Sequence, residues 1–224
     1  MKATAIWKRA LFAAALPLVL SCSDGSAWRQ AVAVLVDVSG TYADQKGEVA
    51  NIVKRDVLPN LLPGDTLLLV RIDSQSYQKE NIEAMLTLDP RPSRANAEKL
   101  AFAQKLDAFA ASGVRSEYTD IPGAMMLAAE YLKEIAAGSR VILVFSDMRD
   151  ELPAGTTREL SASELAGIEV VAVNVKRLHS DNADPQLYRT RLEGWQERVM
   201  HHGAAGWRQV LDASQLPTQL AQLR

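Results

Sequence analysis

Four largely apolar segments, each rich in β-branched residues, constrain the fold of this chain more than any other feature of its sequence. They cover residues 31–36, 66–72, 141–145 and 168–173. A strand with one solvent-exposed face alternates apolar and polar residues, whereas a strand buried on both faces shows no such alternation. The four segments therefore predict a parallel sheet that is covered on both sides.

The segment of residues 82–88 shows a different pattern, in which apolar residues alternate with Glu83, Met85 and Thr87. Alternation of this kind predicts a strand with one buried face, as at the edge of a sheet. Because this segment follows residues 66–72 closely, we expect the two to form an antiparallel hairpin.

Helical periods separate the predicted strands. Apolar residues recur every three or four positions in stripes that begin at Phe102, Met125 and Tyr188, and a shorter stripe begins at Leu216 after a short strand at residues 209–211. Alternation of strands and helices with short connections is typical of a doubly wound α/β domain. We expect a mostly parallel sheet with one antiparallel edge strand and helices on both faces.

Three residues are predicted to mark the ends of these helices. Pro122 suits the first turn of the helix that contains Met125, and Gly138 suits the C-terminal cap of the same helix. Ser214 is a candidate N-cap for the last helix of the chain.

The first 21 residues have the features of a signal peptide. Lys2, Lys8 and Arg9 form a basic start, and an apolar run follows over residues 10–20. This run is shorter than the roughly 20 apolar residues that cross a bilayer as a helix, but it has the length of a signal-peptide core. We therefore expect residues 1–21 to direct export and to be removed.

Cys22 is the only cysteine of the chain, so it has no partner for an intramolecular disulfide. With the small Ser21 before it, the sequence VLSC resembles the lipobox of bacterial lipoproteins, although Leu is more usual than Val at its first position. The resemblance implies a diacylated Cys22 that anchors the mature protein in the cell envelope, facing the periplasm. Ser23, in place of Asp, favours the outer membrane. Residues 22–29 would be a tether to a domain over residues 30–224. The alternative is an ordinary signal peptide followed by an incidental thiol.

The net charge argues against one class of function. The 21 leader residues contain three of the 25 basic residues and no acidic one, which leaves 22 basic against 27 acidic residues, a net charge of −5. A mildly acidic domain lacks the basic surface that binds nucleic acid. We therefore expect no nucleic-acid partner.

Polar residues gather at one edge of the predicted sheet. Asp37, Ser39 and Thr41 follow the first strand, Thr119 precedes a helix, and Asp147 follows the strand at residues 141–145. Because ligands bind at the carboxyl ends of parallel strands, we expect these side chains to converge. Hydroxyl and carboxylate oxygens without His or Cys suit Mg²⁺, Mn²⁺ or Ca²⁺ rather than zinc.

Three segments resemble the motifs of von Willebrand factor type A domains and occur in that family's order. The first is VLVDVSGTY at residues 34–42, which resembles Asp-x-Ser-x-Ser with Thr41 in the last place. The second is TDIPGAM at residues 119–125, and the third is VILVFSD at residues 141–147. The resemblance covers roughly residues 31–224.

This resemblance implies a metal ion-dependent adhesion site. Ser39, Thr41 and Thr119 would be direct ligands, and Asp37 and Asp147 would act directly or through water. An acidic residue of a protein partner fills the remaining position in the family, because neutral hydroxyl ligands leave Mg²⁺ with an uncompensated charge. The resemblance implies a domain that binds rather than catalyses.

A second interpretation belongs to a different class of protein. The sequence LVDVSGT also resembles the first motif of haloacid dehalogenase-type hydrolases, in which Asp37 would be a nucleophile, with Asp147 and Asp150 holding Mg²⁺. The phosphatase form requires a second Asp where this chain has Ser39. Thr119 should also end a strand in such a hydrolase, whereas here it is predicted to introduce a helix.

A third interpretation is a von Willebrand type A scaffold with a degenerate metal site. Met148 occupies a position where the family often has Gly, and Tyr118 and Glu117 stand where small Gly residues often precede the second Thr. Thr41 could then be only a helix cap. Metal binding distinguishes this interpretation from the adhesion-type one.

Overall fold

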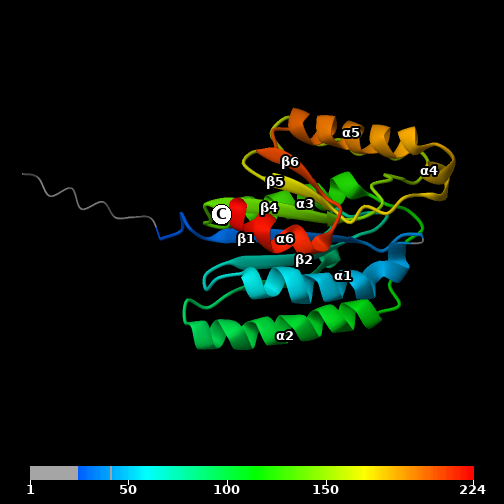
Figure 1. Ribbon diagram of the computed structural model, residues 1–224. Coiled ribbons are helices and arrows are strands. Elements are labelled where there is room, and N and C mark those ends of the chain that lie inside the picture. Colours follow the sequence, from blue (N-terminus) through cyan, green and yellow to red (C-terminus); the bar gives the residue numbers. More distant parts are fainter. Residues whose placement is uncertain (1–24, 41) are drawn as a thin grey trace, which may run out of the picture.

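The computed structural model describes residues 25–40 and 42–224 and has a six-stranded sheet at its centre (Figure 1). The strand order is β3-β2-β1-β4-β5-β6. The strands are β1 (Gln30–Asp37), β2 (Thr66–Ile72), β3 (Ile82–Thr87), β4 (Ser139–Phe145), β5 (Glu169–Val173) and β6 (Gly206–Val210). Neighbouring strands pair in parallel, except that β3 pairs antiparallel with β2 at the edge. The predicted fold class is confirmed. The predicted leader, Cys22 and Thr41 lie outside the described residues.

Helices cover both faces of the sheet. They are α1 (Lys46–Ile52), α2 (Pro92–Ala111), α3 (Ile121–Glu134), α4 (His179–Ala183), α5 (Pro185–His201) and α6 (Leu216–Gln222). Residues of α1, α2 and α6 share one hydrophobic cluster, and residues of α3 and α5 share the other. Figure 1 shows α1 and α6 in front of the sheet and α3 behind it. None of the helices in the described part of the chain combines the length and the apolar character that a membrane crossing requires.

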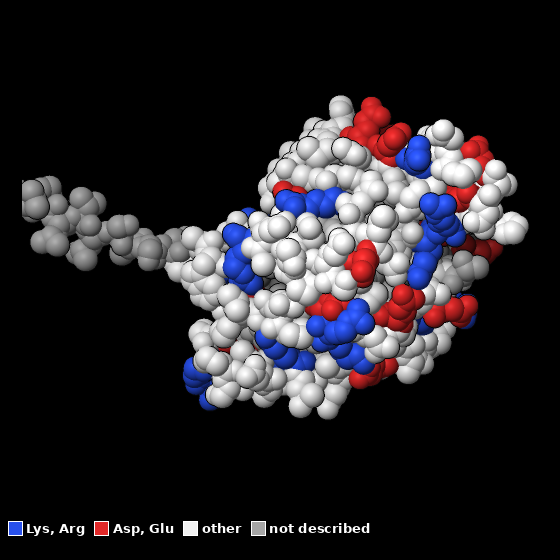
Figure 2. All heavy atoms as spheres, viewed as in Figure 1, with Lys and Arg blue, Asp and Glu red and all other residues white. Residues whose placement is uncertain are grey.

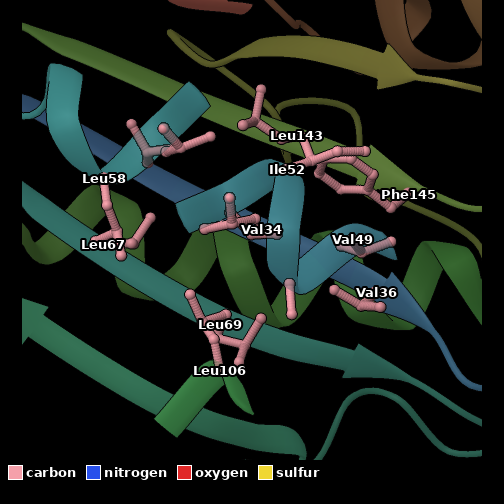
Figure 3. Close-up of a cluster of buried hydrophobic side chains, with 14 of the residues drawn as sticks. Val34, Val36, Val49, Ile52, Leu58, Leu67, Leu69, Leu106, Leu143 and Phe145 are labelled. Carbon is pink, nitrogen blue, oxygen red and sulfur yellow. The ribbon is translucent and has the colours of Figure 1, made fainter. Parts of the chain in front are cut away.

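The central strand β1 supplies side chains to both clusters, as its unbroken apolar pattern predicts. Val34 and Val36 point toward α1 and α2, whereas Ala33 and Leu35 point toward α3. Figure 3 shows part of the first cluster, with Val36 near Val49 of α1 and with Leu69 of β2 next to Leu106 of α2. All eight residues of β1 are buried, so this strand fixes the position of whatever follows Asp37.

No helical apolar stripe is predicted between β1 and β2, yet the structure has a helix there. After a 3₁₀ turn at Tyr42–Gln45, α1 continues into a π-helical turn at Val53–Val57 and a second 3₁₀ turn at Leu58–Asn60. The π turn inserts an extra residue into the helical repeat, which interrupts a regular apolar stripe. The shorter turns at Lys79–Asn81 and Ala213–Gln215 are also 3₁₀.

Two of the three predicted helix ends are wrong. Pro122 lies in the first turn of α3 as predicted, but α3 ends at Glu134, before Gly138. The Gly138 amide donates to the carbonyls of Ser26 and Arg29, both at 3.0 Å. A Cβ on this residue would lie 1.8 Å from the carbonyl oxygen of Ala27, so Gly138 allows a close backbone approach instead of capping the helix.

The last helix also begins differently from the prediction. Ser214 lies inside the 3₁₀ turn that precedes α6, and its amide donates to the side chain of Asp212 at 2.9 Å. Asp212 therefore caps this turn, since its carboxylate accepts a bond from an N–H that has no helical partner.

Candidate metal centre

The predicted site residues lie at the carboxyl edge of the sheet, where β1 and β4 are neighbours. The chain continues from β1 to β2 on one side of β1, and β4 lies on its other side, so this edge is the topological switch point of the sheet. Three loops meet there: one follows Asp37 at the end of β1, one precedes Ile121 at the start of α3, and one follows Phe145 at the end of β4.

Asp37 is at the centre of the site and is 1% exposed. Its Oδ1 accepts bonds from the amide of Ser39 at 2.8 Å and from the hydroxyl of Ser39 at 2.6 Å, and its Oδ2 accepts the hydroxyl of Ser146 at 2.7 Å. Burial raises the pKa of Asp37 to about 6, although these hydrogen bonds oppose the rise. The carboxyl group is thus oriented by neutral donors at a cost in desolvation.

Thr119 approaches the same network from the loop before α3. Its hydroxyl oxygen lies 2.5 Å from that of Ser39. Backbone bonds position Thr119, whose amide donates to the carbonyl of Glu151 at 2.7 Å while the Glu151 amide donates back at 2.9 Å. The next residue, Asp120, caps α3 by accepting the Gly123 amide at 2.8 Å. Thr119 therefore lies directly before the N-cap of α3, pairs only through an isolated bridge with Glu151, and does not end a strand of the sheet.

Asp147 lies outside this hydrogen-bond network, but it lines a pocket that Ser39 and Thr119 also line. The pocket has a volume of about 680 Å³, and its wall includes Ser39, Thr119 and Asp147. The Oδ1 of Asp147 accepts the amide of Arg149 at 2.8 Å. Burial raises the pKa of Asp147, while the positive charges of Arg191 and Arg149 oppose the rise. The structure thus brings Asp37, Ser39 and Thr119 into contact and adds Asp147 as a neighbour.

Ser146 is a member of the site that was not predicted from the sequence. Its hydroxyl donates to Asp37 and also accepts the amide of Met148 at 3.0 Å. The sequence does contain a signal for it, because Ser146 directly follows a buried strand and lies at the edge where Asp37 ends β1.

Met148 has a backbone conformation that glycine adopts more readily than other residues. Its φ is 62°, in the left-handed region that glycine adopts at no steric cost. The side chain of Met148 is fully buried, and its carbonyl accepts the indole N–H of Trp195 at 2.7 Å. Packing and two hydrogen bonds therefore hold a conformation that a non-glycine residue rarely adopts.

The donor set fits a hard divalent cation. Adjacent ligands of an octahedral Mg²⁺ ion at 2.0–2.1 Å lie roughly 3 Å apart. The Ser39 hydroxyl lies 2.6 Å from Asp37 and 2.5 Å from Thr119, so small rotations would open the required space. Within residues 25–40 and 42–224, no three His, Cys, Asp or Glu side chains gather in a metal-holding group, so hydroxyls would supply much of the coordination.

Solved structures of other proteins resemble this chain in fold, at low sequence identity. No protein-family model matches the sequence, and no curated protein matches it. Among solved structures, BatB from Bacteroides thetaiotaomicron is 16% identical with a TM-score of 0.51, over 87% of this chain and 96% of that chain. The pilus adhesin SpaC from Lactobacillus rhamnosus GG is 13% identical with a TM-score of 0.50, over 87% of this chain and 29% of that chain. A D319A mutant of the PilB minor pilin from Streptococcus sanguinis is 9% identical with a TM-score of 0.50, over 89% and 61%.

At identities of this size the likeness concerns the fold. In its strand order, its single antiparallel edge strand and its helices on both faces, the chain has the fold of von Willebrand factor type A domains. The chain spans less than a third of the SpaC adhesin and nearly the whole of BatB.

Proposed function

We propose that this protein is a membrane-anchored binding protein that recruits a protein partner through a divalent cation. Mg²⁺, or alternatively Mn²⁺ or Ca²⁺, would be held by Asp37, Ser39, Thr41, Thr119 and Asp147. The observation that supports the proposal best is the environment of Asp37. Its carboxylate is buried, and its hydrogen bonds from described residues come from hydroxyl and amide groups, with no cationic side chain.

Each described residue has a separate part in this arrangement. Asp37 orients the Ser39 hydroxyl, Ser146 fixes the second oxygen of Asp37, and the backbone of Glu151 fixes Thr119. A cation bound mainly by neutral hydroxyls would keep much of its charge and would attract an external carboxylate.

The wall of the pocket carries charges of both signs. Arg149, Lys176 and Arg177 line it and would meet an acidic partner, but the acidic Glu117, Asp147 and Glu151 line it as well. Two of these cations also have acidic neighbours, since Arg149 lies 3.4 Å from Glu151 and Lys176 lies 3.3 Å from Glu48. Exposed charges of this kind steer association more than they set its affinity.

The membrane part of the proposal rests on the sequence. A basic start, an apolar run and the lipobox-like VLSC support acylation of Cys22 and a place in the bacterial cell envelope, facing the periplasm. Ser23 after the cysteine favours the outer membrane.

Thermal unfolding of the full chain during titration with Mg²⁺ tests the metal site. A cation at ten times its dissociation constant adds roughly 1.4 kcal/mol to the stability of the folded state. For a domain of this size that corresponds to a rise of about 3–6 °C in the unfolding midpoint. We expect Ser39→Ala to abolish the rise.

Thr66→Val is the matched control. It also removes a buried hydroxyl, which lies 3.0 Å from that of Thr87 at the opposite edge of the sheet. The control should keep the full response to Mg²⁺. Equal responses of the wild type and Ser39→Ala would place the cation elsewhere, and no response at millimolar Mg²⁺ would reject the metal proposal.

A second candidate is a scaffold that works without a cation. The observation in its favour is that the hydroxyls of Ser39, Thr119 and Ser146 already have hydrogen-bond partners, so none needs a metal for its satisfaction. The same titration separates the two candidates.

A further inference from the structure

The amino edge of the sheet, opposite the metal site, has a surface of its own. The described chain enters there at the turn before Gln30, and α6 brings the C-terminus back to the same end (Figure 1). One buried carboxylate, that of Asp65, joins these segments. It accepts the amides of Gln30 at 2.8 Å and Leu62 at 2.7 Å, and both of its oxygens accept bonds from Arg224, at 3.0 and 2.7 Å.

This clamp holds two large apolar side chains in solvent. Trp28 is 47% exposed and Leu62 is 44% exposed. Both flank the tight turn that contains Gly64, whose φ is 92° and whose missing Cβ would lie 3.3 Å from the Trp28 ring. The carbonyl of Trp28 accepts a bond from Arg224 at 3.1 Å. The backbone that carries both side chains is therefore held in place.

Basic residues follow the segment that is bonded to this turn. Arg91 and Arg94 are exposed at the start of α2, and the amide of Gly64 donates to Leu88, which places that segment against the turn. Acidic residues here include Asp65, which is buried against Arg224, and Asp89, which lies 2.6 Å from Arg91. Figure 2 shows blue atoms at this end of the molecule, beside the described N-terminus, and most of the red atoms elsewhere.

The chain length ties this surface to the proposed anchor. Trp28 is six residues after Cys22, a separation that extended backbone spans in about 20 Å at most. An acylated Cys22 would lie at the bilayer surface, so the amino edge would have to remain near the lipid headgroups. Trp settles at that level because its ring is apolar and its N–H is polar, and cations are attracted to anionic lipids.

We infer that the amino edge of the domain is a membrane-contact surface on which Trp28 and Leu62 enter the headgroup region of an anionic bilayer. The inference rests on the proposed lipid anchor and adds an orientation to it. Residues Gln30–Asp37 of β1 would then stand between bilayer and metal site. Eight residues of extended strand, at about 3.3 Å each, separate the two by roughly 26 Å.

The test uses the full lipidated chain in vesicles made of equal parts of phosphatidylglycerol and an acyl-brominated phosphatidylcholine, which quenches nearby Trp emission. Trp28→Phe gives the background from the remaining tryptophans. In that background Leu62→Trp places a reporter on the proposed contact surface. Leu211→Trp places one in a side chain that is 70% exposed directly after β6, at the carboxyl edge, and serves as the matched control.

We expect the brominated lipid to remove roughly half of the emission of Trp28 and of the reporter at position 62, because a ring at the headgroup level lies near the acyl chains. The reporter at position 211 should lose none. Equal quenching at positions 62 and 211, or equal quenching of the wild type and Trp28→Phe, would overturn the inference while leaving the anchor intact.

Sedimentation with the vesicles tests the anchor separately. The wild type should sediment, and the full chain with Cys22→Ser should be released. If Cys22→Ser makes no difference, acylation is rejected and the inference falls with it. Circular dichroism of each variant confirms that the fold is retained.

Discussion

Two buried aspartates lie at opposite edges of the same sheet and have opposite environments. Asp65, at the amino edge, is paired with both terminal nitrogens of Arg224 and with two backbone amides. Asp37, at the carboxyl edge, is bonded to Ser39 and Ser146. One carboxylate therefore has its counter-charge inside the described protein, and the other has only neutral donors.

The difference indicates that Asp65 has a structural role, whereas Asp37 can still accept a cation. A buried charge is stable when it is paired and hydrogen-bonded, and costs several kcal/mol when it is not. Asp65 joins the N-terminal turn to the C-terminus and needs nothing more. Burial raises the pKa of Asp37, so this group favours any added cation that can reach it.

The largest effect on stability is expected when the ion pair between Asp65 and Arg224 at the amino edge is broken. Arg224→Met would leave Asp65 buried without its cation, and we expect the free energy of unfolding to fall by about 3–5 kcal/mol, measured by urea denaturation. Arg91→Met is the control, since Arg91 is exposed and its pair with Asp89 is worth about 0–1 kcal/mol. Equal losses in the two variants would show that Asp65 is not a clamp.

The pH dependence of stability tests whether Asp37, at the carboxyl edge, is buried without a counter-charge. The pKa of Asp37 is about 6 in the folded protein against 3.8 for the ordinary group, so the folded state binds the proton more tightly. Its contribution is therefore favourable below about pH 4 and is lost as the pH rises through about 6, a total of about 3 kcal/mol without divalent ions.

The measurement is the unfolding free energy of the wild type against Asp37→Asn, from pH 4 to 7 with a chelator present. The difference between the two curves should shift in favour of Asp37→Asn as the pH rises. Parallel curves would contradict an ionised, unpaired carboxylate at this edge.

A smaller effect is expected where the N-terminal turn meets the start of β4. Gly138→Ala would bring a methyl group against the carbonyl of Ala27, and we expect a loss of about 2 kcal/mol together with a change in Trp28 emission. Gly113→Ala is the control, because no atom lies within 4 Å of its missing Cβ. An unchanged Trp28 emission would show that the turn is not fixed by this contact.

The sheet could be predicted from the sequence because its evidence is local. The boundaries of β2 agree with the prediction at both ends, and the alternation in residues 82–88 identifies β3 as the antiparallel edge. The helix that follows β1 was missed, since its π turn at Val53–Val57 disturbs the apolar repeat. Gly138 was misread because its reason lies in Ala27, more than a hundred residues earlier.

The site could be predicted in part for a similar reason. The rule that carboxyl ends of strands meet at one edge brings Asp37, Ser39 and Thr119 together without knowledge of any side-chain rotamer. The role of Ser146 depends on the direction of its hydroxyl, and the Asp65 clamp joins residues 159 positions apart. The position of Ser146 after β4 marks it as a candidate but does not show its bond to Asp37, and the Asp65 clamp leaves no local signal.

The left-handed backbone at Met148 has a consequence for how this sequence can vary. Glycine would satisfy the backbone there but would empty a fully buried volume, and a larger or β-branched residue would fill the volume but strain the backbone. No single replacement meets both demands. Substitutions at position 148 should therefore be accompanied by substitutions at Trp195. Trp195 belongs to the same buried cluster as Met148, and its indole N–H donates to the Met148 carbonyl.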